Sequence, residues 1–550
     1  MSESAVYEFG QRRGERMPAQ KAGGLYKTLM AVRYCSAHSV PCLSGRNGHL
    51  RGQAKFQITP FTALAPAQAV GSYSARCAIV PSPAQNRQGR QVNRRSNKSA
   101  ALFSALLIFL AAGLLFPPPS CAQQPQASAP AQSPVAAIPS SGQVQGYTLT
   151  PSQEAQAVAY ARARHELYFL DVAYGLLLLV LILQLRVAPA FRDWATQWTD
   201  SSFGQIVVFA PLLLMTIDVL SLPIALWEHR LALQYQQSIQ GWGSWLVDWA
   251  KGEGVEIAIA ILLVWLLYAV IRKSPRKWWF WFWVAAVPLI ILGAIVEPVI
   301  VEPLFFKFTP LASSEPRLAA NIEQMTIRAG APIPQSRIFE MNASAKLRQL
   351  NAYVTGLSAS KRVVVWDTTI RRMSGDEVLF VTGHEMGHYV LGHVRDGILF
   401  ACGVLVFFLY LAYRVLEWML ARCGETWAIR SPDDLASLPA LILLLTVFGF
   451  LFTPISNAYS RHLEHQADQY GLEVIHGLIP DAPVVAAHAF QVLGEVDLDE
   501  PNPSAAVKIW FYNHPPLDER MRFAQTYDPW SQGRSPEFVT GAGATLSPPK

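Results

Sequence analysis

Residues 381–393 read Val-Thr-Gly-His-Glu-Met-Gly-His-Tyr-Val-Leu-Gly-His and contain the pattern His-Glu-x-x-His. Residues four apart lie one above the other on a helix, so His384 and His388 can direct two imidazole nitrogens at one tetrahedral metal ion. Glu385 lies one position further around the helix, where it can accept a proton from an attacking water without being a ligand. Two ligands do not make a site, and the pattern can arise by chance in a chain with 12 histidines. Other parts of the chain must supply the rest.

A second stretch offers the missing ligand. Residues 456–470 read Ser-Asn-Ala-Tyr-Ser-Arg-His-Leu-Glu-His-Gln-Ala-Asp-Gln-Tyr and follow an apolar run. Glu464 and Asp468 are four apart on one helical face, so Glu464 can complete the ligand set while Asp468 accepts the spare N–H of a ligand histidine. The alternative is a solvated helical face with ordinary charge pairs, Arg461 and Asp468 included. The favoured interpretation is one Zn²⁺ per chain held by His384, His388 and Glu464, although these ligands suit several divalent metals.

These two stretches resemble the gluzincin pattern of zinc metalloendopeptidases. Further stretches are similar to the type I CAAX prenyl endopeptidases, a family of integral-membrane zinc metalloproteases, and they occur in the order found in that family. The resemblance extends from about residue 150 to about residue 525. It rests on Pro-Leu-Phe-Phe-Lys-Phe-Thr-Pro-Leu at 303–311, Asn-Ala-Tyr-Val-Thr-Gly at 351–356, Lys-Arg-Val-Val-Val-Trp-Asp-Thr at 361–368, Ser460-Arg461, and His-Pro-Pro-Leu-Asp-Glu-Arg at 514–520.

The resemblance implies roles for further residues. It assigns Asn351, Ala352 and Tyr353 to an edge strand that receives the substrate, and it places His514 near the scissile bond, where a donor could stabilise an oxyanion. It also assigns Arg461, with Asp468, to the surroundings of the metal ligands. Substrates of that family are peptides with a lipidated C-terminal cysteine, cleaved in a chamber within the membrane. Without the resemblance, a helix-capping or packing role for His514 remains open.

Composition favours a membrane protein, since 51% of the residues are hydrophobic and only 15% are charged. Six apolar stretches are long enough, or nearly so, to cross a bilayer as helices. Buried core helices are the alternative, but six of them in one chain argue against it. The predicted fold class is mainly α: a polytopic transmembrane bundle of six to seven helices with an inserted zincin-like α+β catalytic domain. The six stretches are 168–185, 205–227, 254–271, 278–301, 397–420 and 438–454.

The first 150 residues differ from the rest. Residues 1–100 are a basic low-complexity extension, without Asp or Glu from 17 to 100, and we expect them to be disordered or not translated, with a transit-type segment as the alternative. Residues 101–122 follow a basic stretch and end in Ser-Cys-Ala, so they form a signal peptide or a first transmembrane helix. Residues 123–150 are rich in Gln, Pro, Ala and Ser and predict a linker.

The remaining chain divides into three parts. Residues 151–301 form an N-terminal transmembrane domain of four helices, 302–525 a zinc metalloprotease domain that includes two further transmembrane helices, and 526–550 a disordered tail. Within the metalloprotease domain, the sequence predicts a helix at 321–329, strands at 336–341, 352–357 and 361–366, and the motif helix at 376–393. His393 lies off the ligand face of that helix and is interpreted as a supporting or structural residue.

Loop charges predict the orientation in the membrane. Nine Arg and Lys residues fall in short loops on one side of the predicted bilayer and two on the other, so the positive-inside rule places the metal site on the trans side. We expect an integral protein of a bacterial inner membrane with its active site towards the periplasm. The resemblance implies the opposite for eukaryotic relatives, whose catalytic domain is held to face the cytosol.

Several functions remain open on the sequence. The favoured one is a membrane-embedded zinc metalloendopeptidase that hydrolyses membrane-associated, prenylated or C-terminal peptide substrates. The partners are thus a peptide or membrane-protein substrate and the lipid bilayer. The basic residues form no nucleic-acid module, so no nucleic acid is expected. The alternatives are a quality-control protease of the HtpX type and a non-catalytic membrane scaffold or chaperone. A metal transporter ranks last because the ligands lie outside the apolar stretches or at their ends.

Overall fold

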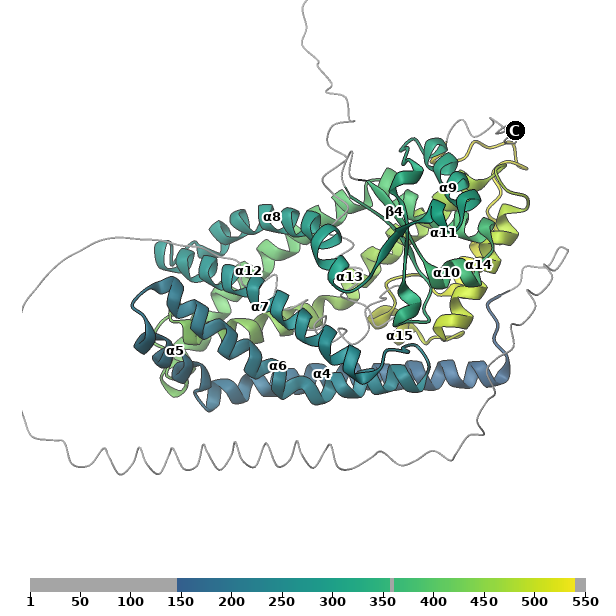
Figure 1. Ribbon diagram of the computed structural model, residues 1–550. Helices are drawn as coiled ribbons and strands as arrows, with labels where there is room; N and C mark the ends of the chain where they lie inside the picture. Colours follow the sequence, from purple (N-terminus) through teal and green to yellow (C-terminus); the bar gives the residue numbers. More distant parts are fainter. Residues whose placement is uncertain (1–145, 357–360, 540–550) are drawn as a thin grey trace, which may run out of the picture.

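The structure, a computed structural model, describes residues 146–356 and 361–539 of the 550-residue chain. A bundle of long helices lies at one end and a small sheet with shorter helices at the other (Figure 1). The expected basic extension, the segment 101–122 and residues 123–145 of the expected linker lie outside the described residues.

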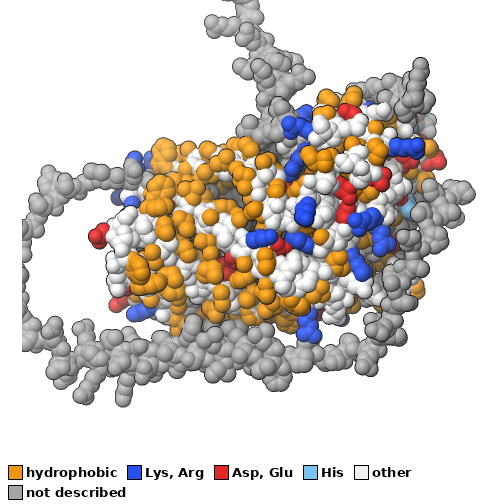
Figure 2. All heavy atoms as spheres, viewed as in Figure 1, with side chains coloured by type: hydrophobic (Ala, Val, Ile, Leu, Met, Phe, Trp, Pro, Cys, Tyr) orange, Lys and Arg blue, Asp and Glu red, His pale blue; other side chains and the backbone are white. Residues whose placement is uncertain are grey.

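Long apolar helices make up the bundle. Within the described residues, six helical stretches are long and apolar enough to cross a membrane. Hydrophobic side chains cover much of the outer surface of the bundle, while charged side chains gather over the end that holds the sheet (Figure 2). The predicted fold class is therefore confirmed. The bundle helices are α4 (Pro151–Gln184), α6 (Ser202–Gln234), α7 (Trp242–Lys273), α8 (Trp278–Val296), α12 (His393–Trp427) and α13 (Leu438–Ile475), and a further helix, α5 (Val187–Trp198), which the sequence analysis missed, follows α4.

The start of α4 corrects the expected linker. Thr150 forms a capping box with Gln153, which fixes the beginning of the helix well before the predicted apolar stretch. Of the residues before the helix, Tyr147 is packed into the protein. It is only 5% exposed, and a Cβ atom on Gly494 would overlap its ring. The aromatic ring of Tyr147 thus occupies space that only a glycine at position 494 leaves free. The composition of residues 123–150 predicted a linker and gave no sign of this contact.

An ion pair closes the end of the bundle opposite the sheet. Arg192 on α5 donates to Asp434 in the turn between α12 and α13, and both side chains are buried. Arg186 donates to the carbonyl oxygens of Glu425 and Thr426 at the end of α12. These contacts hold α5 and the end of α4 against α12 and the start of α13. Separating a buried charge pair leaves uncompensated charges, so the helices are held in fixed positions relative to one another.

The sheet lies between α8 and α12 in the sequence. It has four described strands in the order β1-β2-β4-β3, in which β2 and β4 are parallel and the two outer strands run antiparallel to their neighbours. The three strands expected from the sequence are present within a few residues of their predicted bounds. The strand that the sequence analysis missed, β1, is short and ends at a proline. The bounds are β1 (Phe308–Pro310), β2 (Ile338–Met341), β3 (Ala352–Thr355) and β4 (Arg362–Trp366).

Helices surround the sheet and connect it to α13. The motif lies on α11, whose predicted range was slightly too long at its end, because the chain turns at Gly392 before α12 begins. A buried core joins the sheet to α11, to the second half of α13 and to two C-terminal helices. The helices are α9 (Pro316–Arg328), α10 (Asp367–Arg372), α11 (Gly375–Val390), α14 (Ala482–Asp497), α15 (Ala505–Phe511) and α16 (Leu517–Thr526).

The residues after α16 correct the expected disordered tail. The chain is described as far as Val539 and remains packed against α13. The buried carboxylate of Glu473 accepts hydrogen bonds from the backbone N–H groups of Glu537, Phe538 and Val539 at 2.7–2.9 Å. The prediction failed because this attachment depends on a single acid more than sixty residues earlier in the sequence. The remaining residues of the tail lie outside the described part.

Helices α11 and α13 cross at glycines. A Cβ atom on Gly387 would lie 2.9 Å from the Cβ of Tyr470 and 3.2 Å from the Cα of Ala467. On the other helix, a Cβ atom on Gly471 would lie 3.1 Å from the backbone nitrogen of His384. Only residues without a side chain allow the two backbones to approach this closely. Gly387 lies within the His-Glu-x-x-His pattern itself, so the close approach occurs where the motif residues are.

We therefore predict that Gly387→Ala destabilises the protein. The added methyl group would force α11 and α13 apart, and overpacking of this kind costs about 1–3 kcal/mol. Thermal unfolding of the detergent-purified protein should show a lower Tm. Gly375→Ala on the same helix is the matched control, since a Cβ atom there has no neighbour within 4 Å. Equal Tm values for the two variants would contradict the packing argument.

The start of α11 is held by a partly buried ionic contact. Ser374 and Glu377 form a capping box, and His488 on α14 donates to the second carboxylate oxygen of Glu377. Burial acts to raise the pKa of Glu377, but the hydrogen bonds from His488 and Ser374 outweigh it and hold that pKa below its usual value. The hydrogen bond to Glu377 raises the pKa of His488 above its usual value, against the effect of burial.

These shifts predict a pH-dependent contribution to stability. His488 stabilises the fold fully below its usual pKa of 6.5 and loses this effect as the pH rises through its raised folded-state value. Glu377 contributes above its usual pKa of 4.5 and loses its effect as the pH falls through its lowered value. The Tm difference between the wild type and His488→Gln should thus be largest between these two values and shrink towards alkaline pH. A difference that stays constant up to pH 9 would contradict this prediction.

Candidate metal centre

Three side chains from two helices meet where α11 crosses α13. The Nε2 atoms of His384 and His388 lie 3.2 Å apart. Glu464 on α13 places one carboxylate oxygen 3.3 Å from the Nε2 of His384 and the other 3.4 Å from that of His388. Within the described residues, this is the group of three His, Cys, Asp or Glu side chains that could hold a metal ion. The residues predicted from the sequence as ligands are therefore brought together.

The spacing of these atoms fits zinc. Zinc forms bonds of about 2.0–2.1 Å to imidazole nitrogen and carboxylate oxygen, and a tetrahedral arrangement places such ligand atoms roughly 3.3–3.4 Å apart. The separations of 3.2–3.4 Å, of which the two to Glu464 involve different carboxylate oxygens, are close to this spacing. Glu464 is fully buried, and a bare carboxylate there would be costly without a cation to compensate it. Both the geometry and the charge of the cluster thus suit a divalent metal.

Asp468 lies behind the first histidine. Its Oδ1 is 2.8 Å from the Nδ1 of His384, so Nε2 is left to face the cluster. Arg520 on α16 donates to both oxygens of Asp468, at 2.6 and 2.8 Å. The expected role of Asp468 agrees with this arrangement. The contact between Arg520 and Asp468 was not predicted, because these two residues are distant in sequence and no local pattern links them.

Glu385 occupies the position expected of a base. It follows His384 on α11 and is neither fully buried nor exposed. Helix geometry directs its side chain about 100° around the axis from that of His384, and it is not one of the three clustered side chains. A water bound between the cluster and Glu385 would be able to lose its proton to this carboxylate.

His514 reaches the cluster from the C-terminal segment. Its Nε2 lies 3.2 Å from a carboxylate oxygen of Glu464, and its Nδ1 lies 2.9 Å from the Oδ1 of Asn513. The ring is 5% exposed. The structure therefore brings this residue, predicted through the family resemblance, to the side of the ligand set. Asn513 orients the ring through its contact with Nδ1, and this role was not predicted from the sequence.

Arg461 requires a correction. It contacts none of the proposed ligands; its guanidinium donates to the backbone carbonyl oxygens of Lys508 and Tyr512. One turn earlier on α13, Asn457 donates to the carbonyl oxygen of Trp510 at 2.6 Å. Arg461 thus acts on the segment that ends at His514, and its influence on the site is indirect. Arg461 lies three residues before Glu464 on the same face of α13, but its side chain extends to the C-terminal segment and not to the ligands.

The proposed substrate strand lies at the edge of the described sheet. β3 pairs with β4 on one side only, and it lies against α11. Asn351 precedes the strand, and its carbonyl oxygen accepts hydrogen bonds from the N–H of Trp366 and the hydroxyl of Thr369. Ala352 is buried, while Tyr353 donates its hydroxyl to Glu302. The edge position agrees with the expectation, but two of the three side chains are turned into the protein.

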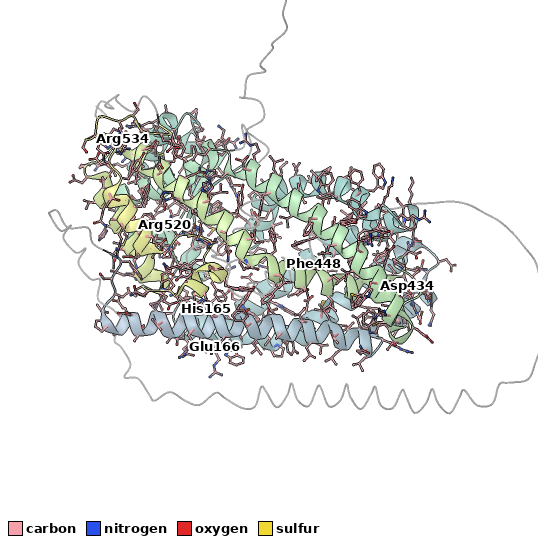
Figure 3. All side chains as sticks on the ribbon, turned by 180° about the vertical axis from the view of Figure 1, so that it is seen from behind. His165, Glu166, Asp434, Phe448, Arg520 and Arg534 are labelled. Carbon is pink, nitrogen blue, oxygen red and sulfur yellow. The ribbon has the colours of Figure 1, made fainter. Side chains whose placement is uncertain are left out.

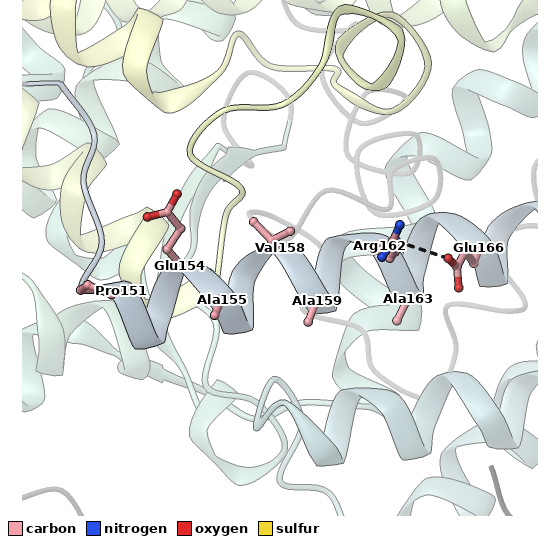
Figure 4. A pocket seen from close by; sticks show the side chains of 8 residues that line it. All are labelled: Pro151, Glu154, Ala155, Val158, Ala159, Arg162, Ala163 and Glu166. Carbon is pink, nitrogen blue, oxygen red and sulfur yellow. Dashed lines mark ion pairs between the residues drawn. The ribbon is translucent and has the colours of Figure 1, made fainter. Parts of the chain in front are cut away.

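Other features of the surface are separate from this cluster. His465, which follows Glu464, packs on Phe523 and is not one of the clustered side chains. A shallow groove along the first half of α4 contains none of the residues discussed above, and an ion pair joins Arg162 and Glu166 beside it (Figure 4). Arg520 and Asp434 mark opposite ends of the molecule in Figure 3, so the metal cluster lies far from the ion pair that closes the bundle.

Two family models match the chain. Residues 141–307 match the model described as CAAX prenyl protease N-terminal, five membrane helices, and residues 312–528 match peptidase family M48. The uncharacterized metalloprotease YhfN of Bacillus subtilis is 33% identical over 377 residues, which cover 68% of this chain and 86% of that protein. CAAX prenyl protease 1 of Saccharomyces cerevisiae is 27% identical over 342 residues, covering 58% of this chain and 72% of that protein.

A solved structure shares the fold. The crystal structure of S. mikatae Ste24p matches with a TM-score of 0.59 at 24% sequence identity, covering 68% of this chain and 88% of that one. The apolar bundle and the cluster on two crossing helices define an integral membrane metalloprotease. The chain belongs to peptidase family M48.

The contacts of Arg461 predict a selective defect. Arg461→Met should release the segment before His514, and a displacement of about 1 Å near a reacting bond lowers activity roughly 100-fold. Zinc content should remain that of the wild type, because the arginine touches no ligand. Peptide hydrolysis and bound zinc would be measured on the same preparation.

The matched control is Arg522→Met on α16, which removes an arginine that pairs with Asp518 at the surface. Full activity of Arg461→Met would show that the segment is held without this residue. Loss of zinc from Arg461→Met would instead place it among the groups that support the ligands.

Proposed function

We propose that the protein is a zinc endopeptidase that cleaves extended segments of membrane-associated peptides or membrane proteins. The observation that carries this proposal is the cluster itself: the Nε2 atoms of His384 and His388 lie 3.2 Å apart, and each lies 3.3–3.4 Å from a carboxylate oxygen of Glu464. His384, His388 and Glu464 are the proposed ligands. When bound, zinc supplies a Lewis acid that polarises the scissile carbonyl and lowers the pKa of water.

The remaining chemistry belongs to the side chains. Glu385 accepts the proton of the attacking water and later delivers it to the leaving amine. Nδ1 of His514 donates to the Oδ1 of Asn513, so the ring can donate from Nε2 when it is doubly protonated. In that form His514 would donate to the oxygen that becomes negative in the tetrahedral intermediate, since Nε2 faces the same space as the Glu464 carboxylate. Asp468 and Arg520 hold His384 in the orientation that this arrangement needs.

The proposed substrate route uses the edge of the sheet. A peptide that adds to β3 as a further strand would be held by main-chain hydrogen bonds, which tolerate many side chains. Asn351, Ala352 and Tyr353 would then act mainly through their backbone, since Ala352 is buried and the Tyr353 hydroxyl is bonded to Glu302. This arrangement favours a broad sequence preference near the scissile bond.

Two substrate classes fit the proposal. The relatives named CAAX prenyl protease 1 support prenylated peptides, whereas a site on the trans side of a bacterial inner membrane, which the loop charges favour, supports general processing or quality control of membrane proteins. We favour the second class and place the active site towards the periplasm. A non-catalytic scaffold is the alternative from another class of function.

We expect Glu385→Gln to keep its zinc and to lose peptide hydrolysis, because the amide cannot accept the proton. His388→Ala should lose the metal. The test is hydrolysis of a quenched peptide library by detergent-purified protein, with bound zinc measured on each sample. Removal of zinc by a chelator should abolish the activity, and added zinc should restore it. An active Glu385→Gln variant would disprove the assignment of the base.

The same assay separates the substrate classes. Matched peptides with and without a farnesylated cysteine would be compared for kcat/KM. Similar rates support general peptide processing, while cleavage of the farnesylated peptide alone supports a prenyl protease. If zinc-loaded wild type cleaves neither peptide, the scaffold function is favoured.

A further inference from the structure

The second proposed histidine ligand has a supporting contact that differs from the first. The Nδ1 of His388 lies 3.1 Å from the Nδ1 of His393, and the Nε2 of His393 lies 3.0 Å from the Oε1 of Gln466. His393 is 2% exposed. These three side chains form a chain that begins at the ligand cluster and ends on α13.

The position of His393 depends on a sharp turn. Gly392 has a φ of 75°, a left-handed conformation in which glycine is unstrained, and it joins the end of α11 to the start of α12. Because His393 is the first residue of α12, it returns beside His388 instead of continuing along the α11 face. A helix that continued through residue 393, as the sequence suggested, would have placed the ring roughly 140° around the helix axis from His388.

The hydrogen positions along the chain follow from one assignment. If His388 binds a metal through Nε2, its Nδ1 carries the hydrogen and must donate it. The Nδ1 of His393 is then the acceptor, which leaves the hydrogen of His393 on Nε2. Gln466 presents a carbonyl oxygen at that position. The N–H of His388 and the N–H of His393 therefore each meet an acceptor, and this series of hydrogen bonds contains no charged side chain.

We propose that His393 is a positioning residue for the metal centre: it holds His388 in the tautomer and ring orientation that metal binding needs, and Gln466 fixes the tautomer of His393. This inference rests on the proposed metal site. It assigns the two ligand histidines different supports, a charged pair of Asp468 and Arg520 for His384 and a neutral pair for His388. Both supports include one residue of α13, which also carries Glu464.

The test measures zinc affinity and needs no substrate. Full-length protein in detergent micelles would be titrated with zinc against a chromophoric chelator. His393→Leu removes the acceptor and should weaken zinc binding about 10- to 100-fold, the usual effect of losing such a partner. Gln466→Leu should weaken it less. The double variant should bind zinc no more weakly than His393→Leu alone, because Gln466 acts through His393.

Controls separate this role from packing. His393→Gln keeps an acceptor oxygen and should restore most of the affinity. His465→Leu changes a neighbouring histidine that packs on Phe523, and its affinity should equal that of the wild type. Thermal unfolding of the metal-free proteins should be similar for the wild type and His393→Gln.

Two results would overturn the inference: wild-type zinc affinity in His393→Leu, or effects of His393→Leu and Gln466→Leu that simply add. If His393→Leu does not fold, Gln466→Leu and Gln466→Glu decide, since the second keeps an acceptor and the first does not. Equal zinc affinities in that pair would reject the relay. Because affinity is read without turnover, the inference can stand even if no peptide is cleaved.

Discussion

The close crossing of α11 and α13 is the constraint on which the rest of the site depends. Gly383, Gly387 and Gly471 let the backbones meet without intervening side chains; a Cβ atom at Gly383 would lie 2.9 Å from Val474. Two histidines from one helix and a glutamate from the other can then share one ion, since tetrahedral zinc requires ligand atoms roughly 3.3–3.4 Å apart. If the helices were further apart, the two histidines of α11 and the glutamate of α13 would be too distant to bind the same ion.

Helix α13 organises more than its own ligand. Asn457, Arg461, Glu464 and Asp468 recur at intervals of three or four residues, so they share one face of the helix. Along this face they contact, in order, the carbonyl of Trp510, the carbonyls of Lys508 and Tyr512 at the end of α15, His514 and Arg520. The C-terminal segment is thus aligned residue by residue with the ligand helix. His514 reaches the cluster because contacts on both sides of it fix the segment.

Sequence reasoning worked where chemistry is local. The spacing of His384 and His388, and of Glu464 and Asp468, places each pair on one helical face, and six apolar stretches are recognisable by length alone. It failed where a contact joins distant residues: Tyr147 against Gly494, Glu473 with the chain at 537–539, and Asp468 with Arg520. Arg461 was misplaced for a related reason: it lies on the same face of α13 as Glu464, but its partners are the carbonyl oxygens of Lys508 and Tyr512, which are distant in sequence.

The metal cluster lies beside the start of α12 and in the second half of α13, both of which are candidate membrane spans. α12 begins at His393, and α13 runs without a break from its apolar half to Glu464. The geometry of the cluster is therefore set by how two spans pack within the bilayer as well as by local contacts. Any change in bundle packing that rotates α13 moves Glu464, Gln466 and Asp468 together, so both histidine supports and the third ligand would shift as one unit. The positions of the proposed ligand atoms therefore depend on how the helices that carry them pack in the bundle.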